Sequence, residues 1–464
     1  MKRDTEAMYA SMDPKKLFLI VALPGMISMF AMSVYSIFEG IFIGHRLGEG
    51  AFAAINIAMP LVMINFSLAD LVGVGASVPI SIALGQKDNK RANNVFSCSV
   101  LMIFITALLM GTVLFTAAEP LCRMMGAEGT LLDTSVHYLR TCALCSPLAA
   151  IFFAMDNYLR ISGYVKTSMA INICCNLATL GLLAFFLIVL DMDVVGSALA
   201  VSISMCTCSL VALIPFVRGK ALLHFAKPQF EFAMLREIAA CGSPIFLNNI
   251  SGRLSAILIN VSLIAVGNQT WGEGGGTTAV AVYAILMYAS DLCWPLLYGI
   301  SDSLSPAIGY NWGAGQYDRV KRIVFCGYVG TAIVGAVSTS ILFFFPGTIA
   351  AMFAKAEDTM LLAQATRAIR LFCFAYLFRW FGVVTQGFFS AIKKPALATL
   401  MSVGTAFVFP VMLLGLWWNW GLDGIWFNFV GVNFLTAVLG TGLLVYVLRL
   451  IKKKEREQAQ AAQE

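Results

Sequence analysis

The chain has 464 residues, of which 59% are hydrophobic and only 12% are charged, and its formal net charge at pH 7 is +6. Soluble proteins carry about 25% charged residues, so this composition excludes a water-soluble globular fold. The basic residues stand in short clusters between apolar runs, without the interleaved aromatic residues of a nucleic-acid surface, so no nucleic-acid partner is expected.

The apolar runs between polar breaks predict twelve membrane-spanning helices, because each is as long as the roughly 20 residues that a helix needs to cross a bilayer. The first run follows Lys15 and Lys16 and is too long for a signal-peptide core, so it is expected to remain as a span. The runs lack the period-two alternation of β-barrel strands. The predicted spans are 17–43, 51–84, 93–118, 133–156, 165–190, 194–217, 237–266, 279–311, 322–346, 361–387, 396–418 and 424–449.

The distribution of Lys and Arg predicts the orientation of these spans. With the amino terminus in the cytoplasm, 23 basic residues fall on the cytoplasmic side and three, Arg46, Arg123 and Lys355, on the outer side. A bias of this size would be lost if one span in mid-chain were missed or added. We therefore expect a multi-pass protein of the cell membrane with both termini in the cytoplasm.

The two halves of the chain repeat each other. Three short motifs recur between about 220 and 230 residues apart, and a longer outer loop at 267–278 explains the change of offset. Each repeat holds six spans, an even number, so both halves enter the membrane in the same direction. The matched motifs are Leu23-Pro24 with Ser243-Pro244, Gly85-Gln86 with Gly315-Gln316, and Gly196 with Gly424.

This repeat predicts an all-α integral membrane protein built as two parallel six-helix lobes. Carriers of this construction bind substrate between the halves and rock about it, although duplicated channels share the pattern and remain an alternative. The expected parts are a cytoplasmic amino-terminal segment (1–16), an amino lobe (17–217), a cytoplasmic linker (218–236), a carboxy lobe (237–449) and a cytoplasmic tail (450–464).

Acids inside the spans are candidates for function, because a charge at the bilayer centre costs about 2.5–3.5 kcal/mol. Glu39, in the outer half of span one, has its repeat mate near Asn260, and Asp291, midway through span eight, has an apolar mate near Leu61. Desolvation favours a neutral carboxyl group, so such an acid can bind and release a proton, or hold Na⁺ with nearby oxygens. The alternatives are a hydrated interfacial position for Glu39 and a structural ion pair with Arg253 for Asp291.

Other polar residues of the spans have less defined roles. Asn172 and Asn176 share a helix face in span five and are expected either near Glu39 or in amide contacts between helices. Asp156 is expected to be hydrated at the cytoplasmic end of span four. The expected gate or structural residues are Asp70 and Asp302, which lie towards the cytoplasmic half, and Pro24 and Pro244, which interrupt spans one and seven.

Enzymatic chemistry and metal binding are not expected. Cys142 and Cys145 have C-x-x-C spacing, but no second pair follows, and the chain has only three histidines. The sequence contains no nucleophile–base pair and no phosphate-binding G-x-x-x-x-G-K-[ST] loop, so ATP drive is unsupported.

Several segments resemble the multidrug and toxic compound extrusion (MATE) family. Pro24 with the segment 38–44 resembles its first span, and the segment 243–253 resembles the start of its seventh. The stretch 298–314 is similar to the end of its eighth span, and 157–163 and 386–389 to the ends of spans four and ten. The likeness covers nearly the whole chain, and the seventh and eighth spans are its most specific part.

The resemblance implies two six-helix lobes arranged as a V, and efflux of cationic amphipathic compounds driven by inward H⁺ or Na⁺. It also implies an ion-coupling site formed by the acid of span one and polar residues of spans four and five. In this chain the matching residues are Glu39, Asn157, Asn172 and Asn176. In the family the span-one acid is usually Asp, whereas this chain has Glu39, and an acid often stands where this chain has Leu180 and Gly181. A Na⁺ site would therefore lack a ligand, which favours H⁺.

Substrate contacts are expected from polar and aromatic residues of both halves, with small organic cations or amphipathic drugs as partners. No cofactor is expected beyond the coupling ion, and the protein is expected to be monomeric in the bilayer. The principal alternative is a lipid or lipid-linked glycan flippase of the related superfamily, which usually adds two further spans. The candidate substrate-binding residues are Asp291, Arg253, Asn260, Tyr35 and Tyr288.

Overall fold

The computed structural model describes residues 2–353 and 358–461, so Lys355 and the last three residues of the predicted tail lie outside the described part. The described secondary structure is helical, and twelve of its segments are long and apolar enough to cross a membrane, which confirms the predicted number. These segments are Pro14–Ile43, Ala53–Gly85, Asn89–Thr116, Gly129–Ile161, Val165–Val189, Val194–Val217, Phe232–Trp271, Gly275–Gly313, Tyr317–Phe344, Thr359–Ala391, Pro395–Leu416 and Trp418–Glu457.

The chain folds as two compact units, one formed by Met1–Phe246 with Gly309–Ala314 and the other by Leu247–Ile308 with Gly315–Glu464. Two helices, α8 (Phe232–Trp271) and α9 (Gly275–Gly313), pass from one unit to the other. The lobe and linker boundaries that the sequence indicates stay predictions.

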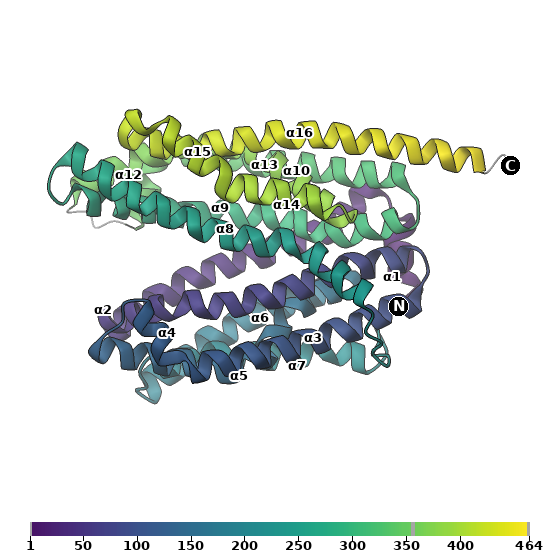
Figure 1. Cartoon of the computed structure of the whole chain (residues 1–464), viewed down its shortest axis with the longest axis horizontal. Coiled ribbons are helices and arrows are strands. Elements are labelled where there is room, and N and C mark those ends of the chain that lie inside the picture. The colour runs from purple at the N-terminus through teal and green to yellow at the C-terminus, as the bar shows by residue number, and fades with distance from the viewer. Residues whose placement is uncertain (1, 354–357, 462–464) are drawn as a thin grey trace. The chain divides into compact units, whose positions relative to one another are not determined.

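In the first unit α5 packs against α2, α3 and α7, and α6 packs against α2 and α7 (Figure 1). The residues of one apolar cluster, including Ile43, Leu132, Leu139 and Leu187, bring α2, α5 and the π-helical segment η1 together. The helices are α1 (Lys2–Ser11), α2 (Pro14–Gly85), α3 (Asn89–Thr116), α4 (Ala118–Met124), α5 (Gly129–Ile161), α6 (Val165–Ala184), η1 (Phe185–Val189) and α7 (Val194–Val217).

The second unit has its own core, centred on Phe372, Tyr376 and Trp426. Its last helix, α16 (Gly421–Ala461), continues beyond the predicted end of span twelve at 449, and Lys321 binds Glu455 of this extension at 2.6 Å. The preceding elements are α10 (Tyr317–Phe344), α11 (Pro346–Ala351), α12 (Thr359–Phe372), η2 (Cys373–Ala375), α13 (Tyr376–Ala391), α14 (Pro395–Val403), the π-helical η3 (Gly404–Val408), α15 (Phe409–Leu416) and η4 (Trp418–Trp420).

Local sequence explains where these helices start and turn. Aspartates that accept backbone N–H groups begin α2, α3, α7 and α12, and their side chains satisfy donors that a helix leaves unpaired. Spans one and two form one long helix, α2, interrupted at Gly48, where φ is +79°. Glycine adopts this left-handed conformation without a steric penalty, so it fits the bend between the two spans.

Glycines also bring helix backbones together in the first unit. A Cβ atom at Gly242 of α8 would lie 1.9 Å from the carbonyl oxygen of Leu71, and one at Gly85 would lie 1.9 Å from that of Tyr310. A Cβ atom at Gly313 would lie 2.1 Å from the Ile82 oxygen. The second half of α2 therefore packs directly against the first turns of α8 and the last turns of α9, as small residues allow in membrane helices.

Candidate functional site

Glu39 lies half-buried on α2, among hydroxyl and thiol groups. Its carboxylate interacts with the hydroxyl of Tyr35, one helical turn earlier, and this hydroxyl also reaches Thr179 of α6. Tyr138 and Cys142 of α5 lie close enough to Glu39 to interact with it electrostatically. Three helices of the first unit thus surround this acid.

No Lys, Arg or His nitrogen lies within 4.0 Å of the Glu39 carboxylate in the part of the chain that the structure describes. Arg46, which follows the first span, is instead bound to Asp191 at 2.9 Å and to the carbonyl oxygen of Leu187 at 3.1 Å. A partly buried carboxylate without a basic partner is a candidate site for a mobile cation, because a bound H⁺ or Na⁺ removes the uncompensated charge.

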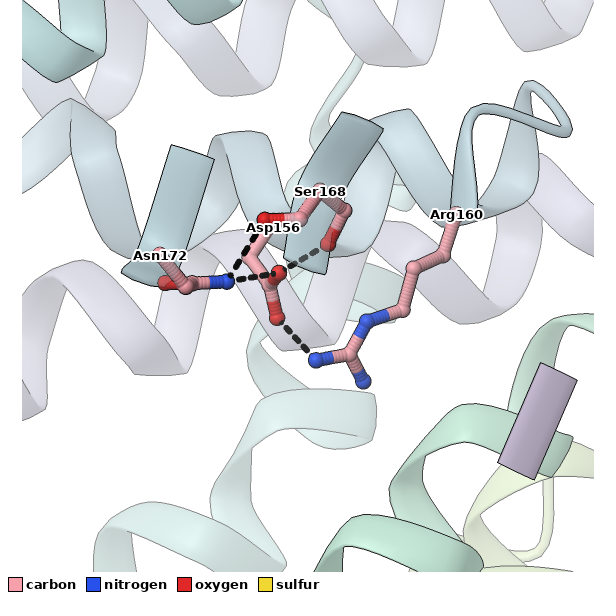
Figure 2. A network of polar contacts seen from close by, with 4 residues as sticks. All are labelled: Asp156, Arg160, Ser168 and Asn172. Atoms are coloured by element: carbon pink, nitrogen blue, oxygen red, sulfur yellow. Dashed lines mark hydrogen bonds and ion pairs between the residues drawn. The ribbon is translucent and has the colours of Figure 1, made fainter. Parts of the chain in front are cut away.

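A second acid of the first unit, Asp156, has the opposite environment (Figure 2). Its carboxylate forms an ion pair with Arg160, four residues later on α5, and accepts a hydrogen bond from the Ser168 hydroxyl. Asn172 Nδ2 donates to Asp156 Oδ1 at 2.7 Å and to the Ser168 carbonyl oxygen at 3.1 Å. The side chain of Asp156 is 14% exposed and that of Arg160 is 1% exposed, so this network is a buried, neutralised cluster rather than a hydrated end of the span.

One face of α6 links the two acids. Ser168, Asn172, Asn176 and Thr179 follow each other at intervals of three or four residues, which places them on the same side of the helix. The stripe runs for about 16 Å, from the Asp156 network to the Tyr35 hydroxyl beside Glu39. Asn176 and Asn157 are half-buried and have no side-chain hydrogen bond among the described residues.

In the second unit Asp291 is exposed on α9. Its electrostatic partner is Arg379 of α13, whose guanidinium lies 4.0 Å from the ring centre of Trp294 and 5.7 Å from that of Tyr376. No ion pair joins Asp291 to Arg253 among the described residues, and Arg253 is exposed on α8. This group therefore combines a carboxylate, Asp291, with the aromatic ring of Trp294 and the guanidinium of Arg379.

The other three predicted substrate-binding residues lie on α8, α9 and α2. Asn260 of α8 is half-buried, and its Oδ1 atom has no hydrogen-bond partner among the described residues. Tyr288 of α9 is 44% exposed and stacks on Phe353, with ring centres 5.3 Å apart. Tyr35 belongs to the first unit, beside Glu39.

The predicted gate or structural residues all lie inside helices. Asp70 and Asp302 are half-buried on α2 and α9. Pro24 and Pro244 are buried within α2 and α8, and both helices continue through them. Pro244 comes two residues after Gly242, so it lies next to the close contact between α8 and α2.

Sequence reasoning missed the roles of Asp156, Arg160 and Ser168. The signal was present, because Asp156 and Arg160 are four residues apart on one helix, and Ser168 and Asn172 are four apart on the next. What the sequence does not show is the rotation that turns these two faces towards each other.

Comparisons with known proteins agree with this architecture. The sequence model of the MatE family matches residues 24–185 and 254–414, two segments that begin 230 residues apart, as the internal repeat predicts. The multidrug export protein MepA of Staphylococcus aureus is 26% identical over 455 residues, which cover 96% of this chain and 97% of MepA. MepA of Staphylococcus haemolyticus is 25% identical over 445 residues and 94% of both chains.

Solved structures show the same fold. An outward-facing MATE family transporter of the MOP superfamily superposes with a TM-score of 0.89 at 22% identity, covering 95% of this chain and 97% of that one. A MATE protein in complex with MaD3S gives 0.90 at 21% identity, covering 97% of this chain and 99% of that one.

Proposed function

The chain belongs to the MatE family, and we propose from that premise that it is a secondary active exporter of cationic or amphipathic organic compounds, driven by antiport with H⁺ or Na⁺. The names of its relatives, multidrug export proteins, support the substrate class. The exporter acts as a monomer in the cell membrane, with both termini in the cytoplasm.

The contrast between the two acids of the first unit carries the proposal. Asp156 has Arg160 as a permanent counter-charge, whereas the described partners of Glu39 are neutral hydroxyl and thiol groups. Glu39 is therefore the carboxylate whose charge depends on a bound ion. When this ion binds or leaves, the free energy of the site changes by the cost of burying a charge, and this change biases the transporter between its states.

The coupling ion of this proposal is a proton. Na⁺ needs several oxygen ligands at once, and the position one turn beyond Asn176, where the family often has an acid, is Leu180. A proton needs only the carboxylate and a neighbouring acceptor such as the Tyr35 hydroxyl. The amide and hydroxyl side chains on one face of α6, from Ser168 to Thr179, supply polar groups between Glu39 and the start of this helix at Val165.

The proposed substrate-binding site is the group of residues around Asp291. An organic cation gains Coulomb energy from the Asp291 carboxylate and quadrupole attraction from the Trp294 face, where Arg379 now lies. Asn260 and Tyr288 add a polar acceptor and an aromatic ring. No observation favours the flippase alternative, since the described helices supply twelve spans rather than the fourteen that it usually has.

Transport into reconstituted vesicles tests the proposal. A fluorescent organic cation should accumulate against its gradient when a pH gradient is imposed, and should not respond to a Na⁺ gradient alone. Accumulation driven by a Na⁺ gradient but not by a pH gradient would show that the coupling ion is Na⁺ rather than H⁺. No response to either gradient would reject cation-coupled export.

A further inference from the structure

The amino-terminal helix α1 carries a buried tyrosine, Tyr9. Of its side chains at positions 7–11, the one that is buried is Tyr9, which is 1% exposed. A ten-residue helix is too short to be stable by itself in water, so α1 depends on contacts with the rest of the protein, and Tyr9 supplies some of them. Burial raises the pKa of the Tyr9 phenol, which therefore stays a hydrogen-bond donor at physiological pH.

Tyr9 joins the ends of two other helices. Its hydroxyl donates to the Arg160 carbonyl oxygen at 2.5 Å, in the last turn of α5. Its own carbonyl oxygen accepts a hydrogen bond from Asn311 Nδ2 at 3.0 Å, and its ring lies 5.9 Å from that of Tyr310. Asn311 and Tyr310 belong to the last turns of α9, so α1 ties α5 to α9 within the first unit.

The end of α9 is also where the chain passes between units. Gly309–Ala314 belongs to the first unit, whereas the residues on either side of it belong to the second. This short segment is pressed against α2, because neither Gly85 nor Gly313 leaves room for a single Cβ atom. Tyr9 thus contacts one of the segments at which the chain passes between the units, and we call this segment, Gly309–Ala314, the joint.

The connection of α1 to the rest of the chain permits release. Asp13, between α1 and α2, has extended backbone angles (φ −50°, ψ 131°), and its side chain caps α2 by accepting Lys15 N at 2.9 Å. The cap of α2 therefore does not depend on α1 being docked. Undocking includes the breakage of the hydrogen bonds of Tyr9 with Arg160 and Asn311 and the removal of its ring from a buried site.

We propose that α1 acts as a latch. When it is docked, Tyr9 holds the end of α5 and the end of α9 together, and this contact must open in each transport cycle. The inference rests on the proposed export function for its role, but the docking of α1 is measurable without transport. While α1 is docked, the end of α9 is held against α2, and exchange between transport states is slow. Release of Tyr9 removes its hydrogen bond with Asn311 and lets the joint move.

Hydrogen exchange of the full-length protein, read by mass spectrometry, tests the docking. Tyr9→Phe keeps the ring and removes the bond to Arg160, so amide exchange in residues 2–11 should rise roughly fivefold to tenfold, the effect of one lost buried hydrogen bond. Tyr9→Ala should raise it further and also speed exchange in 309–314. Tyr164→Phe is the matched control, because it removes a phenol-to-carbonyl bond, to Lys220 at 3.2 Å, that does not involve α1. It should leave the exchange of α1 unchanged.

The same variants in vesicles test the role of the latch. Tyr9→Phe and Tyr9→Ala should increase leak of a preloaded organic cation in the absence of a gradient, in the same order as their exchange rates, while Tyr164→Phe should not. Unchanged exchange in α1, or faster exchange with unchanged leak, would overturn the latch. A wild-type protein that moves no organic cation would instead refute the export function, and the exchange data would still report whether Tyr9 docks α1.

Discussion

Asn172 donates a hydrogen bond to the carboxylate of Asp156, with 2.7 Å between Nδ2 and Oδ1, so its amide group binds Asp156 rather than Glu39. This contact divides the polar residues of the first unit into two groups. Asp156, with Arg160 and Ser168, is a neutralised cluster, and Glu39, with Tyr35 and hydroxyl neighbours, lacks a basic partner among the described residues. Stability is expected to depend on the first group and ion coupling on the second.

Asp156→Asn is expected to destabilise the protein by about 3 kcal/mol, because the 1% exposed guanidinium of Arg160 loses its counter-charge. The thermal unfolding midpoint in detergent measures this loss. Asp423→Asn is the control, since its ion pair with Arg367 is exposed and should contribute less than about 1 kcal/mol. Equal midpoints for the two variants would contradict a structural role for Asp156.

Gly313→Ala should separate the ends of α2 and α9, because its Cβ would lie 2.1 Å from the Ile82 oxygen. The expected loss of stability is about 1–3 kcal/mol, as for other overpacked sites. Gly442→Ala, in α16, meets no atom within 4 Å and should stabilise the protein by about 0.5–1 kcal/mol. Opposite shifts of the unfolding midpoint would confirm the close contact, and a neutral Gly313→Ala would refute it.

Asp291→Asn should weaken the binding of a permanently charged organic cation by roughly fivefold, the effect of one partly exposed charge pair. Binding of a neutral analogue of the same shape should not change. Fluorescence titration of the purified protein measures both, and Asp133→Asn, an exposed acid of α5, is the control. An equal loss for the charged and the neutral compound would exclude Asp291 as a charge partner of the substrate.

A protease-cleavable tag after Glu464 should be resistant in intact spheroplasts and cut in inverted vesicles, because the basic loops predict a cytoplasmic carboxy terminus. A tag inserted near Gly274, in the predicted outer loop 267–278, should show the reverse. The same accessibility for both tags would show that the number of crossings between them is even, and the predicted topology would be wrong.

The spans were predictable from the sequence because hydrocarbon thickness fixes the length of each apolar run. The predicted span 194–217 coincides with α7 (Val194–Val217). Helix ends outside the membrane were less predictable, since polar sequence continues a helix as readily as it ends one. The extension of α16 to Ala461, fastened by Lys321 to Glu455, is such a case.

The candidate site was predictable by residue type but not by partner. Glu39 and Asp291 stand out in apolar sequence, and nothing in the order of residues shows that Arg379, rather than Arg253, is the electrostatic partner of Asp291. Arg379 lies 88 positions from Asp291, on another helix, and only helix packing brings them together. The same holds for Tyr9, whose partners Arg160 and Asn311 lie 151 and 302 positions away.

The most direct test of the account compares Glu39→Gln with Glu119→Gln, an exposed acid of α4, in vesicles with an imposed pH gradient. Glu39→Gln should still exchange labelled for unlabelled substrate without a gradient, but its gradient-driven accumulation should fall to the level of empty vesicles. Glu119→Gln should accumulate substrate like the wild type. Full gradient-driven accumulation by Glu39→Gln would contradict the claim that this carboxylate couples the ion to export.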